Sequence, residues 1–332
     1  MKRYLFVLGV AASMLVLGCE PPNTETSDRM DVIFDTDANN EVDDQHALAY
    51  LLFNPASFRT LGVTVNATRS GGAIANHVAE AKRIVSLCNM TGDVPVLVGA
   101  DSGYAEIEPH LGEPDFDGHE AVDFIIEKAN RADKQSLVII AVGKLTNVAL
   151  ALKKDPGIAG KIRLVWLGSN YPRPGEYNLE NDTRALQFLL EQPITLEAVT
   201  VRYGEPTGTD AVRVTRELIH QKMQGKGPRA GEPVTGRHGE EFDRFGDYSI
   251  SLFDHINYYG DPPARALFDM AAVAIVKNPE WAMRKHIPLP MFRDDQWIEQ
   301  PGNQRDMIVW ENFDANGILD DFFETMDGAA AR

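Results

Sequence analysis

Apolar runs of strand length alternate with amphipathic segments along most of this chain. The runs are rich in β-branched residues, and the segments between them repeat their apolar positions with the spacing of a helix. The predicted strands are "DVIFDTD" (31–37), "TLGVTVNAT" (60–68), "QSLVIIAVG" (135–143), "IRLVWLG" (162–168) and "ITLEAVTV" (194–201). The predicted helices lie at 43–53, 73–90, 145–154 and 183–191.

Continuous apolar strands separated by helices indicate a sheet that is covered on both faces. The pattern therefore predicts an α/β fold, a doubly wound and mainly parallel sheet with helices on both faces. We expect residues 31–332 to form a single domain of this type. In such sheets, ligands bind outside the carboxyl ends of the strands, so polar residues that follow a strand are candidates for the functional site.

The composition is that of a globular protein, and its acidic charge makes some classes of binding partner unsuitable. The chain has 332 residues, of which 44% are hydrophobic and 24% are charged, with a formal net charge of -17. Nucleic acids and anionic bilayer surfaces bind proteins that cluster Lys and Arg, which makes both unsuitable partners here. A small neutral or cationic ligand fits this charge better.

The first nineteen residues, "MKRYLFVLGVAASMLVLGC", have the pattern of an export signal. A basic start precedes an apolar run that is too short to span a bilayer as a mature helix. The ending "LVLGC" resembles a bacterial lipobox, which predicts a signal peptide at 1–19 and a lipid on Cys19, with an ordinary signal peptide or an uncleaved anchor as alternatives. Residues 20–30 would be a polar tether. We expect an exported protein that meets the membrane only through this lipid and faces the periplasm or the cell exterior.

An acidic cluster follows the first predicted strand. Asp35, Asp37, Glu41, Asp43 and Asp44 fall within ten residues, at the carboxyl end where a ligand is expected. Burying several carboxylates without a cation is costly, and hard cations such as Ca²⁺ and Mg²⁺ bind carboxylate oxygens. The cluster therefore suggests a cation site.

Two familiar motifs match this cluster only in part. An EF-hand loop would need Gly at its sixth position, where Asn40 lies, and Glu at its twelfth, where His46 lies. A strand-end D-x-D phosphatase would use Asp35 as its nucleophile and Asp37 as its acid. That interpretation leaves the carboxylates at 43 and 44 without a role.

The sequence resembles the nucleoside hydrolase family, the metal-dependent N-ribohydrolases typified by the inosine–uridine-preferring enzymes. Their signature D-x-D-P-G-x-D-D after a strand is similar to "FDTDANNEVDD" here. Four further segments follow in the family's order: "VPVLVGA", "GKLTNVALAL", "EYNLENDTRA" and "LFDMAAVA". The resemblance covers about residues 31–279. It implies hydrolysis of the N-glycosidic bond of a ribonucleoside or related riboside.

The resemblance also implies a role for individual residues. A Ca²⁺ ion, with Mg²⁺ as the alternative, would be held by Asp37, Asp44, the Thr146 carbonyl and Asp269. Six to eight oxygen ligands suit Ca²⁺, which leaves positions for water and for sugar hydroxyls. Asp37 would in addition be the general base that takes a proton from the attacking water.

The remaining implied residues bind the sugar. Asp43 would accept a hydrogen bond from a ribose hydroxyl, and Glu176 and Asn178 would bind the ribose and favour the oxocarbenium-like charge of the transition state. Asn66, which follows the second strand, would also contact the substrate. Asp35 would orient its neighbours from behind.

Two departures from the family pattern affect the site: the longer first loop could bring Asn39, Asn40 or Glu41 to the ligand, and the second departure concerns the leaving group. The loop between Asp37 and Asp43 is two residues longer than in the family, and Phe268 stands where purine-preferring members have a His that helps to protonate the departing base. The insertion at 235–256 contains His238 between two glycines, where small neighbours allow close approach. We therefore predict His238 as the acid.

Two classes of function stay open from the sequence. The first is riboside hydrolysis, and the second is a non-catalytic, Ca²⁺-dependent nucleoside- or sugar-binding lipoprotein that has lost its acid with Phe268. Asp37 favours the enzyme, because a binding protein has no need of a base. The sequence leaves open the preferred base and the oligomeric state, with a homo-oligomer among the alternatives.

Overall fold

The structure is a computed structural model that describes Met1 and residues 29–329. The predicted signal peptide, Cys19 and the tether lie outside the described residues, apart from Met1, Arg29 and Met30. Export and lipid anchoring therefore stay predictions. In the described part of the chain, no helix has both the length and the apolar character that crossing a membrane would require.

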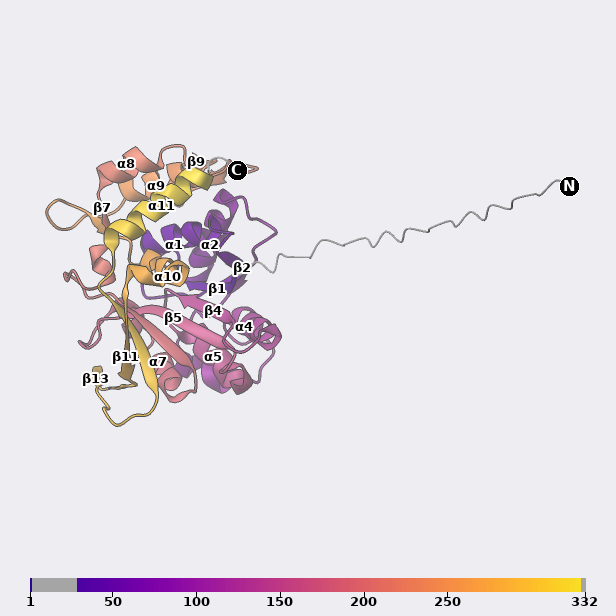
Figure 1. The fold of residues 1–332 in the computed structure, drawn as a ribbon, viewed down its shortest axis with the longest axis vertical. Coiled ribbons are helices and arrows are strands. Elements are labelled where there is room, and N and C mark those ends of the chain that lie inside the picture. Colours follow the sequence, from indigo (N-terminus) through magenta and orange to yellow (C-terminus); the bar gives the residue numbers. More distant parts are fainter. Residues whose placement is uncertain (2–28, 330–332) are drawn as a thin grey trace.

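One eight-stranded sheet forms the centre of the fold (Figure 1). Seven of its strands are parallel, and β11 at one edge runs antiparallel to β14. In spatial order the strands are β11 (Met283–Pro288), β14 (Asp306–Glu311), β6 (Thr195–Thr200), β5 (Ile162–Ser169), β4 (Leu137–Ala141), β1 (Met30–Thr36), β2 (Phe58–Val65) and β3 (Val96–Val98). The predicted doubly wound, mainly parallel sheet is confirmed.

Helices cover both faces of this sheet. In Figure 1, α4, α5 and α7 lie on one side of the strands, and α1, α2 and α10 lie on the other. The helices are α1 (Asp43–Leu52), α2 (Ile74–Leu87), α3 (Tyr104–Ile107), α4 (His119–Arg131), α5 (Thr146–Lys154), α6 (Tyr177–Asn181), α7 (Thr183–Glu191), α8 (Arg216–Met223), α9 (Phe245–Asp254), α10 (Phe268–Lys277) and α11 (Ala315–Ala329). The four helices predicted after the first four predicted strands correspond to α1, α2, α5 and α7.

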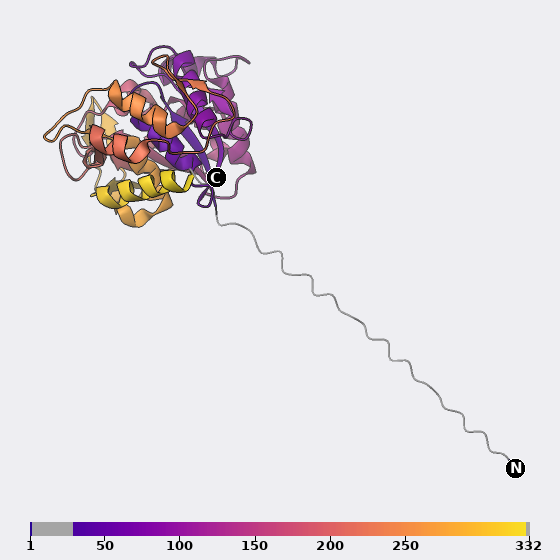
Figure 2. The ribbon, with the colours of Figure 1, turned by 90° about the horizontal axis from the view of Figure 1, so that it is seen from above.

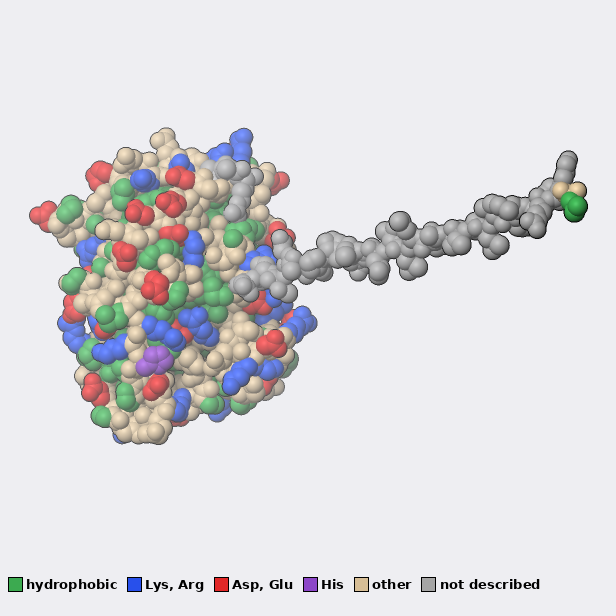
Figure 3. Space-filling model, in the orientation of Figure 1, with side chains coloured by type: hydrophobic (Ala, Val, Ile, Leu, Met, Phe, Trp, Pro, Cys, Tyr) green, Lys and Arg blue, Asp and Glu red, His purple; other side chains and the backbone are tan. Residues whose placement is uncertain are grey.

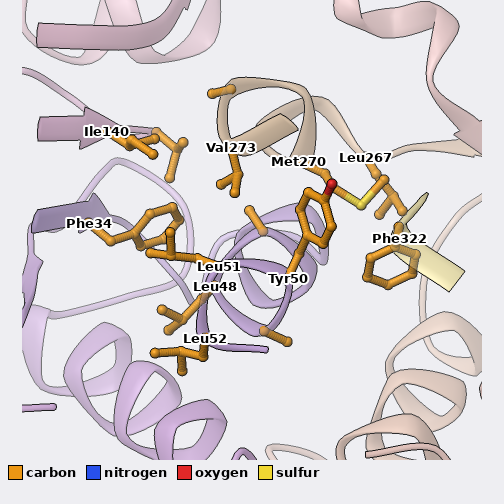
Figure 4. Packing of buried hydrophobic residues seen from close by; sticks show 14 of the residues in the cluster. Phe34, Leu48, Tyr50, Leu51, Leu52, Ile140, Leu267, Met270, Val273 and Phe322 are labelled. Atoms are coloured by element: carbon orange, nitrogen blue, oxygen red, sulfur yellow. The ribbon is translucent and has the colours of Figure 1, made fainter. Parts of the chain in front are cut away.

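Each central strand contributes to two hydrophobic cores, because successive side chains point to opposite faces of the sheet. In β1, Val32 and Phe34 pack with α1 and α10, whereas Ile33 packs with α4 and α5. Figure 4 shows the first core, in which Phe34 of β1 lies next to Leu51 of α1, with Val273 of α10 nearby. Buried side chains on both faces explain why these strands are apolar without interruption.

Helices α8, α9 and α11 form an additional layer over α1 (Figure 2). Short pairs of strands connect the larger elements: β7 (Arg213–Val214) with β10 (Arg265–Ala266), β8 (Val234–Thr235) with β9 (Glu241–Phe242), and β12 (Met291–Arg293) with β13 (Gln296–Ile298). Single 3₁₀ turns are η1 (Glu108–His110), η2 (Pro156–Ile158), η3 (Thr209–Ala211) and η4 (Pro279–Trp281). On the face shown in Figure 3, acidic side chains are interspersed with basic ones.

The strand order indicates where along the sheet a ligand would bind. Strand β1 has β2 on one side and β4 on the other, and the chain turns in opposite directions from there, as in the doubly wound folds that bind ligands at this point. The carboxyl ends of β1, β4 and β5 are therefore neighbours. The loops after them bring residues from distant parts of the sequence together.

Candidate active site

A cavity of about 370 Å³ opens at the carboxyl edge of the sheet. Its walls come from the loop after β1 and from the first turns of α1, α6 and α10, with further residues from the ends of β4, β5 and β6 and from the β7–β10 pair. The lining residues are Asp37, Asn40, Glu41, Asp43, Asp44, Val142, Leu167, Glu176, Tyr177, Asn178, Val201, Tyr203, Gly204, Asp210, Arg213, Tyr259, Arg265, Phe268 and Asp269.

Asp35 fixes the floor beneath this cavity. It is fully buried and accepts hydrogen bonds from Thr64 Oγ1 at 2.6 Å, Asn66 Nδ2 at 2.8 Å and Asn147 Nδ2 at 2.8 Å. These donors come from β2, the loop after it and α5, so a single carboxylate connects three segments around β1. Burial raises the pKa of Asp35 to about 6 in spite of the three bonds. Asp35 thus connects these segments beneath the cavity, and its orienting role in the reaction stays a prediction.

Asp35→Ala should destabilise the fold, because it leaves three buried donors without their acceptor. Each unsatisfied buried group costs about 1–3 kcal/mol, so we expect the free energy of unfolding to fall by more than about 3 kcal/mol. Urea unfolding measures this change. Asp31→Ala is the matched control, since Asp31 lies on the same strand in an exposed pair with Arg59 and should change stability by about 1 kcal/mol or less. Equal effects of the two substitutions would contradict this role.

Carboxylates gather at one end of the cavity. Asp43, Asp44 and Asp269 each offer an oxygen within 4.8 Å of the others, and all three are buried. Asp37 lines the same cavity and accepts a hydrogen bond from Thr68 Oγ1, while Asp44 accepts one from Thr36 Oγ1 at 2.5 Å. We call Asp37, Asp43, Asp44 and Asp269 the carboxylate cluster.

Two helix N-termini support the cluster. Asp43 and Asp44 are the first two residues of α1, and Asp269 is the second residue of α10, which packs against α1. The N-terminus of a helix carries a partial positive charge and unpaired N–H groups, which stabilise nearby carboxylates. The sequence places the aspartates at these two helix starts, and the packing of the helices brings them together.

The electrostatics of the cluster favour a bound cation. Burial raises the pKa of Asp37 to about 6. Burial and repulsion from neighbouring carboxylates raise the pKa of Asp43 to about 7 and raise the pKa of Asp44 and Asp269 well above the usual value. Among the described residues, no Lys, Arg or His forms a salt bridge with these four carboxylates. Buried charges are normally paired or bound to a metal, and an all-oxygen donor set suits a hard divalent ion.

Two polar residues of the α6 segment extend the site beyond the cluster. Glu176 caps α6 by accepting a hydrogen bond from the Leu179 N–H at 2.9 Å, and burial raises its pKa to about 7. Asn178 Nδ2 donates to the carbonyls of Val142 at 2.8 Å and Leu167 at 3.1 Å. Asn178 is therefore held against the ends of β4 and β5, and Glu176 is held at the start of α6.

The structure brings most of the predicted site residues to the cavity, but not Thr146, Asn66 or His238. Thr146 begins α5, where its carbonyl faces the next helical turn, and its Oγ1 donates to Asp182 Oδ2 at 2.6 Å. The strand-end residue Val142 lines the cavity in its place. Asn66 lies beneath the lining with its amide on Asp35, and its Oδ1 has no partner among the described residues.

Gly143 allows this close arrangement at the end of β4. A Cβ atom there would lie 2.8 Å from Asn66 Oδ1 and 3.1 Å from Asp37 Oδ1. Any larger residue would push both polar groups away from β4. The glycine thus lets the β4–α5 loop approach the carboxylate cluster.

His238 does not reach the cavity. It lies in the turn between β8 and β9, where its exposed ring stacks on His255 with centroids 4.1 Å apart. Partial burial and the neighbouring Arg237 and His255 lower the pKa of His238. The glycines beside it shape a hairpin turn that carries the ring outward, so the predicted role as leaving-group acid finds no support in its position.

Several residues that line the cavity were not predicted from the sequence. The aromatic ring of Tyr203 meets Phe268 edge to face at 5.8 Å, and Tyr259, Arg213 and Arg265 also line the cavity. They come from loops and two-residue strands that carry no periodic signal. Only the substitution of Phe268 for His pointed to this region.

The comparison with known families decides the assignment. The sequence model of the inosine-uridine preferring nucleoside hydrolase family matches residues 32–312. This chain belongs to that family. The predicted family is therefore confirmed, and since nucleoside hydrolases are N-glycosidases, membership agrees with the predicted enzyme class.

The sequence identity between this chain and individual nucleoside hydrolases is low. The chain is 28% identical to probable uridine nucleosidase 2 of Oryza sativa over 51% of this chain and 54% of the relative, so it spans about half of that protein. It is 23% identical to the inosine-uridine preferring nucleoside hydrolase of Crithidia fasciculata, over 65% of this chain and 70% of the relative. The structure of the inosine-uridine preferring nucleoside hydrolase from Bacillus anthracis superimposes with a TM-score of 0.66 at 18% identity, covering 90% of this chain and 99% of that one. This last likeness establishes the shared fold.

Proposed function

We propose that this protein hydrolyses the N-glycosidic bond of ribonucleosides with the help of a divalent cation, Ca²⁺ rather than Mg²⁺. The observation that carries the proposal is the buried carboxylate cluster, which shares one cavity with Glu176 and Asn178. Membership of the nucleoside hydrolase family supports the reaction.

The donor set fits a calcium ion. Asp43, Asp44 and Asp269 would form the core of the site, and Asp37 and Val142 line the same cavity. Ca²⁺ accepts irregular cages of six to eight protein oxygens, whereas Mg²⁺ keeps several waters in a strict octahedron. When bound, the cation would supply Lewis-acid polarisation and an anchor for hydroxyl groups.

Asp37 is the group best placed to take a proton from water. Its carboxylate lines the cavity, and the hydrogen bond from Thr68 Oγ1 fixes its orientation. Burial raises its pKa to about 6, which keeps it ionised at neutral pH while bringing its basicity closer to the working range.

The ribose would lie between the cluster and the α6 segment. Because Asp43 has two carboxylate oxygens, it can contribute to the cation site and still accept from a ribose hydroxyl. Glu176 places negative charge where an oxocarbenium-like sugar develops positive charge, and such preorganised charges stabilise a transition state. Asn178, held by the Val142 and Leu167 carbonyls, would fix the sugar against the strand ends.

The proposal includes the place where the protein acts. On the pattern of residues 1–19, the mature chain would carry a lipid on Cys19 and act on nucleosides outside the cytoplasmic membrane. The mass of the purified N-terminal peptide tests this, since Cys19→Ser should remove the lipid.

The test of the reaction is the release of base and ribose from a panel of ribonucleosides in the presence of Ca²⁺. Stoichiometric release of both products supports hydrolysis. Binding of nucleosides without any release would instead support the non-catalytic binding protein.

A further inference from the structure

Arg265 is a buried cation that lines the same cavity as the carboxylate cluster. Its side chain is 8% exposed, and its Nη2 forms an ion pair with Glu41. The ring of Tyr259 lies 5.4 Å from the guanidinium carbon. Among the described residues, its buried Nε has no hydrogen-bond partner. Leaving a buried donor unsatisfied costs free energy, so the Nε–H of Arg265 is available to donate a hydrogen bond to a ligand.

Arg213 also lines the cavity, but its hydrogen bonding differs from that of Arg265. Arg213 donates from Nε to the Asp210 carbonyl at 2.8 Å and from Nη2 to Asp210 Oδ2 at 2.6 Å. Its Nε and Nη2 are thus bonded to protein groups. The Nε of Arg265, in contrast, is buried without a partner among the described residues.

Arg265 also connects the two departures from the family pattern. Glu41 belongs to the loop that is two residues longer here, and Phe268, three residues after Arg265, replaces the family's His. All three residues line the cavity. The longer loop supplies the carboxylate that holds Arg265 at the place where the usual acid is missing.

We propose that the Arg265 guanidinium binds the departing base and stabilises the negative charge that develops on it. This inference rests on the proposed function. Arginine stays protonated in proteins, so Arg265 acts as a hydrogen-bond donor and a fixed positive charge, not as an acid. It would donate to a ring nitrogen or carbonyl oxygen of the base.

The reaction balances without a protein acid. The C1′–N bond breaks and its electron pair stays on the base, while the water oxygen bonds to C1′ and a water proton passes to Asp37. The base leaves as an anion beside Arg265 and takes a proton from solvent, and Asp37 returns its proton to solvent. Nucleoside and water thus give ribose and the neutral base.

Arg265→Gln tests this role with two kinds of substrate. For inosine and uridine we expect kcat to fall by about 10²-fold, as when a donor to a developing charge is removed, with KM changed less than about threefold. For nitrophenyl riboside we expect a change below about threefold, because nitrophenolate is stable as an anion. Arg265→Lys keeps the charge and should recover part of the loss. His238→Ala is the control and should leave both substrates unaffected.

The outcomes separate the inference from the proposed function. Equal losses on both substrate types, or no loss on either, would overturn the role of Arg265, and a selective loss in His238→Ala would assign it to His238 instead. If Arg265→Gln fails to fold by circular dichroism, Arg265→Lys decides by the same comparison. If the wild-type protein with Ca²⁺ cleaves neither substrate type, the proposed function fails and the inference fails with it.

Discussion

Replacing Asp37 with Asn is expected to lower kcat for ribonucleoside hydrolysis by about 10²–10⁴-fold, the usual contribution of a general base. The amide keeps the size of the side chain and one oxygen donor, but it cannot take a proton from water. Asp37 lines the cavity and is oriented by Thr68, so the substitution removes basicity with little change in shape. Steady-state kinetics at saturating Ca²⁺ measure the loss.

The control for this substitution is Asp123→Asn. Asp123 lies on α4, where it pairs with Lys154 on the protein surface, and its loss should leave kcat within about twofold. Saturating Ca²⁺ separates a lost base from a weakened cation site. Hydrolysis by Asp37→Asn at the wild-type rate would eliminate Asp37 as the base.

Without a cation, the folded protein should become less stable as the pH rises from about 5 to 8. The pKa is raised by burial to about 6 for Asp35 and Asp37 and to about 7 for Asp43 and Glu176. The folded state therefore binds more protons than the unfolded state between the ordinary carboxyl pKa and these values. Their contribution to stability is complete below the unfolded pKa and is lost as the pH rises through the folded pKa.

Calcium should reverse this trend, since it neutralises the cluster. At pH 8 we expect a saturating excess of Ca²⁺ to raise Tm by about 5–10 °C over protein in chelator, with a smaller shift at pH 5, where protons compete with the ion. Calorimetry at both pH values measures the shifts. Asp269→Asn is the matched variant: it removes one buried charge, so it should be more stable than wild type in chelator at pH 8 and lose most of the calcium response. Identical Tm values with calcium and chelator would contradict the cation site.

The central sheet could be predicted from the sequence because each buried strand is a continuous apolar run between clear helical patterns. Strand β14 and the two edge strands, β11 and the three-residue β3, were not predicted. Burial in β11 is confined to Ile287, so its sequence alternates too little to indicate a strand. β14 is apolar, but it follows the short β12–β13 pair rather than a helix, which removes the βαβ pattern on which the other predictions rest.

The candidate site was predictable where a motif residue directly follows a strand or begins a helix, as for Asp37, Asp44 and Asp269. The "GKLTN" segment located the β4–α5 loop, but a motif does not tell which carbonyl faces the cavity, and the structure favours Val142 over Thr146. The role proposed for Arg265 depends on its ion pair with Glu41, which is far away in the sequence. Only the structure could reveal this pair.

The most direct test of the cation-dependent hydrolysis proposed here is a calcium titration of chelator-stripped protein, in which bound metal and inosine hydrolysis are measured in the same samples. The account predicts about one ion per chain, with activity absent in the stripped protein and rising in proportion to occupancy. Full activity in protein that holds no divalent metal would contradict it.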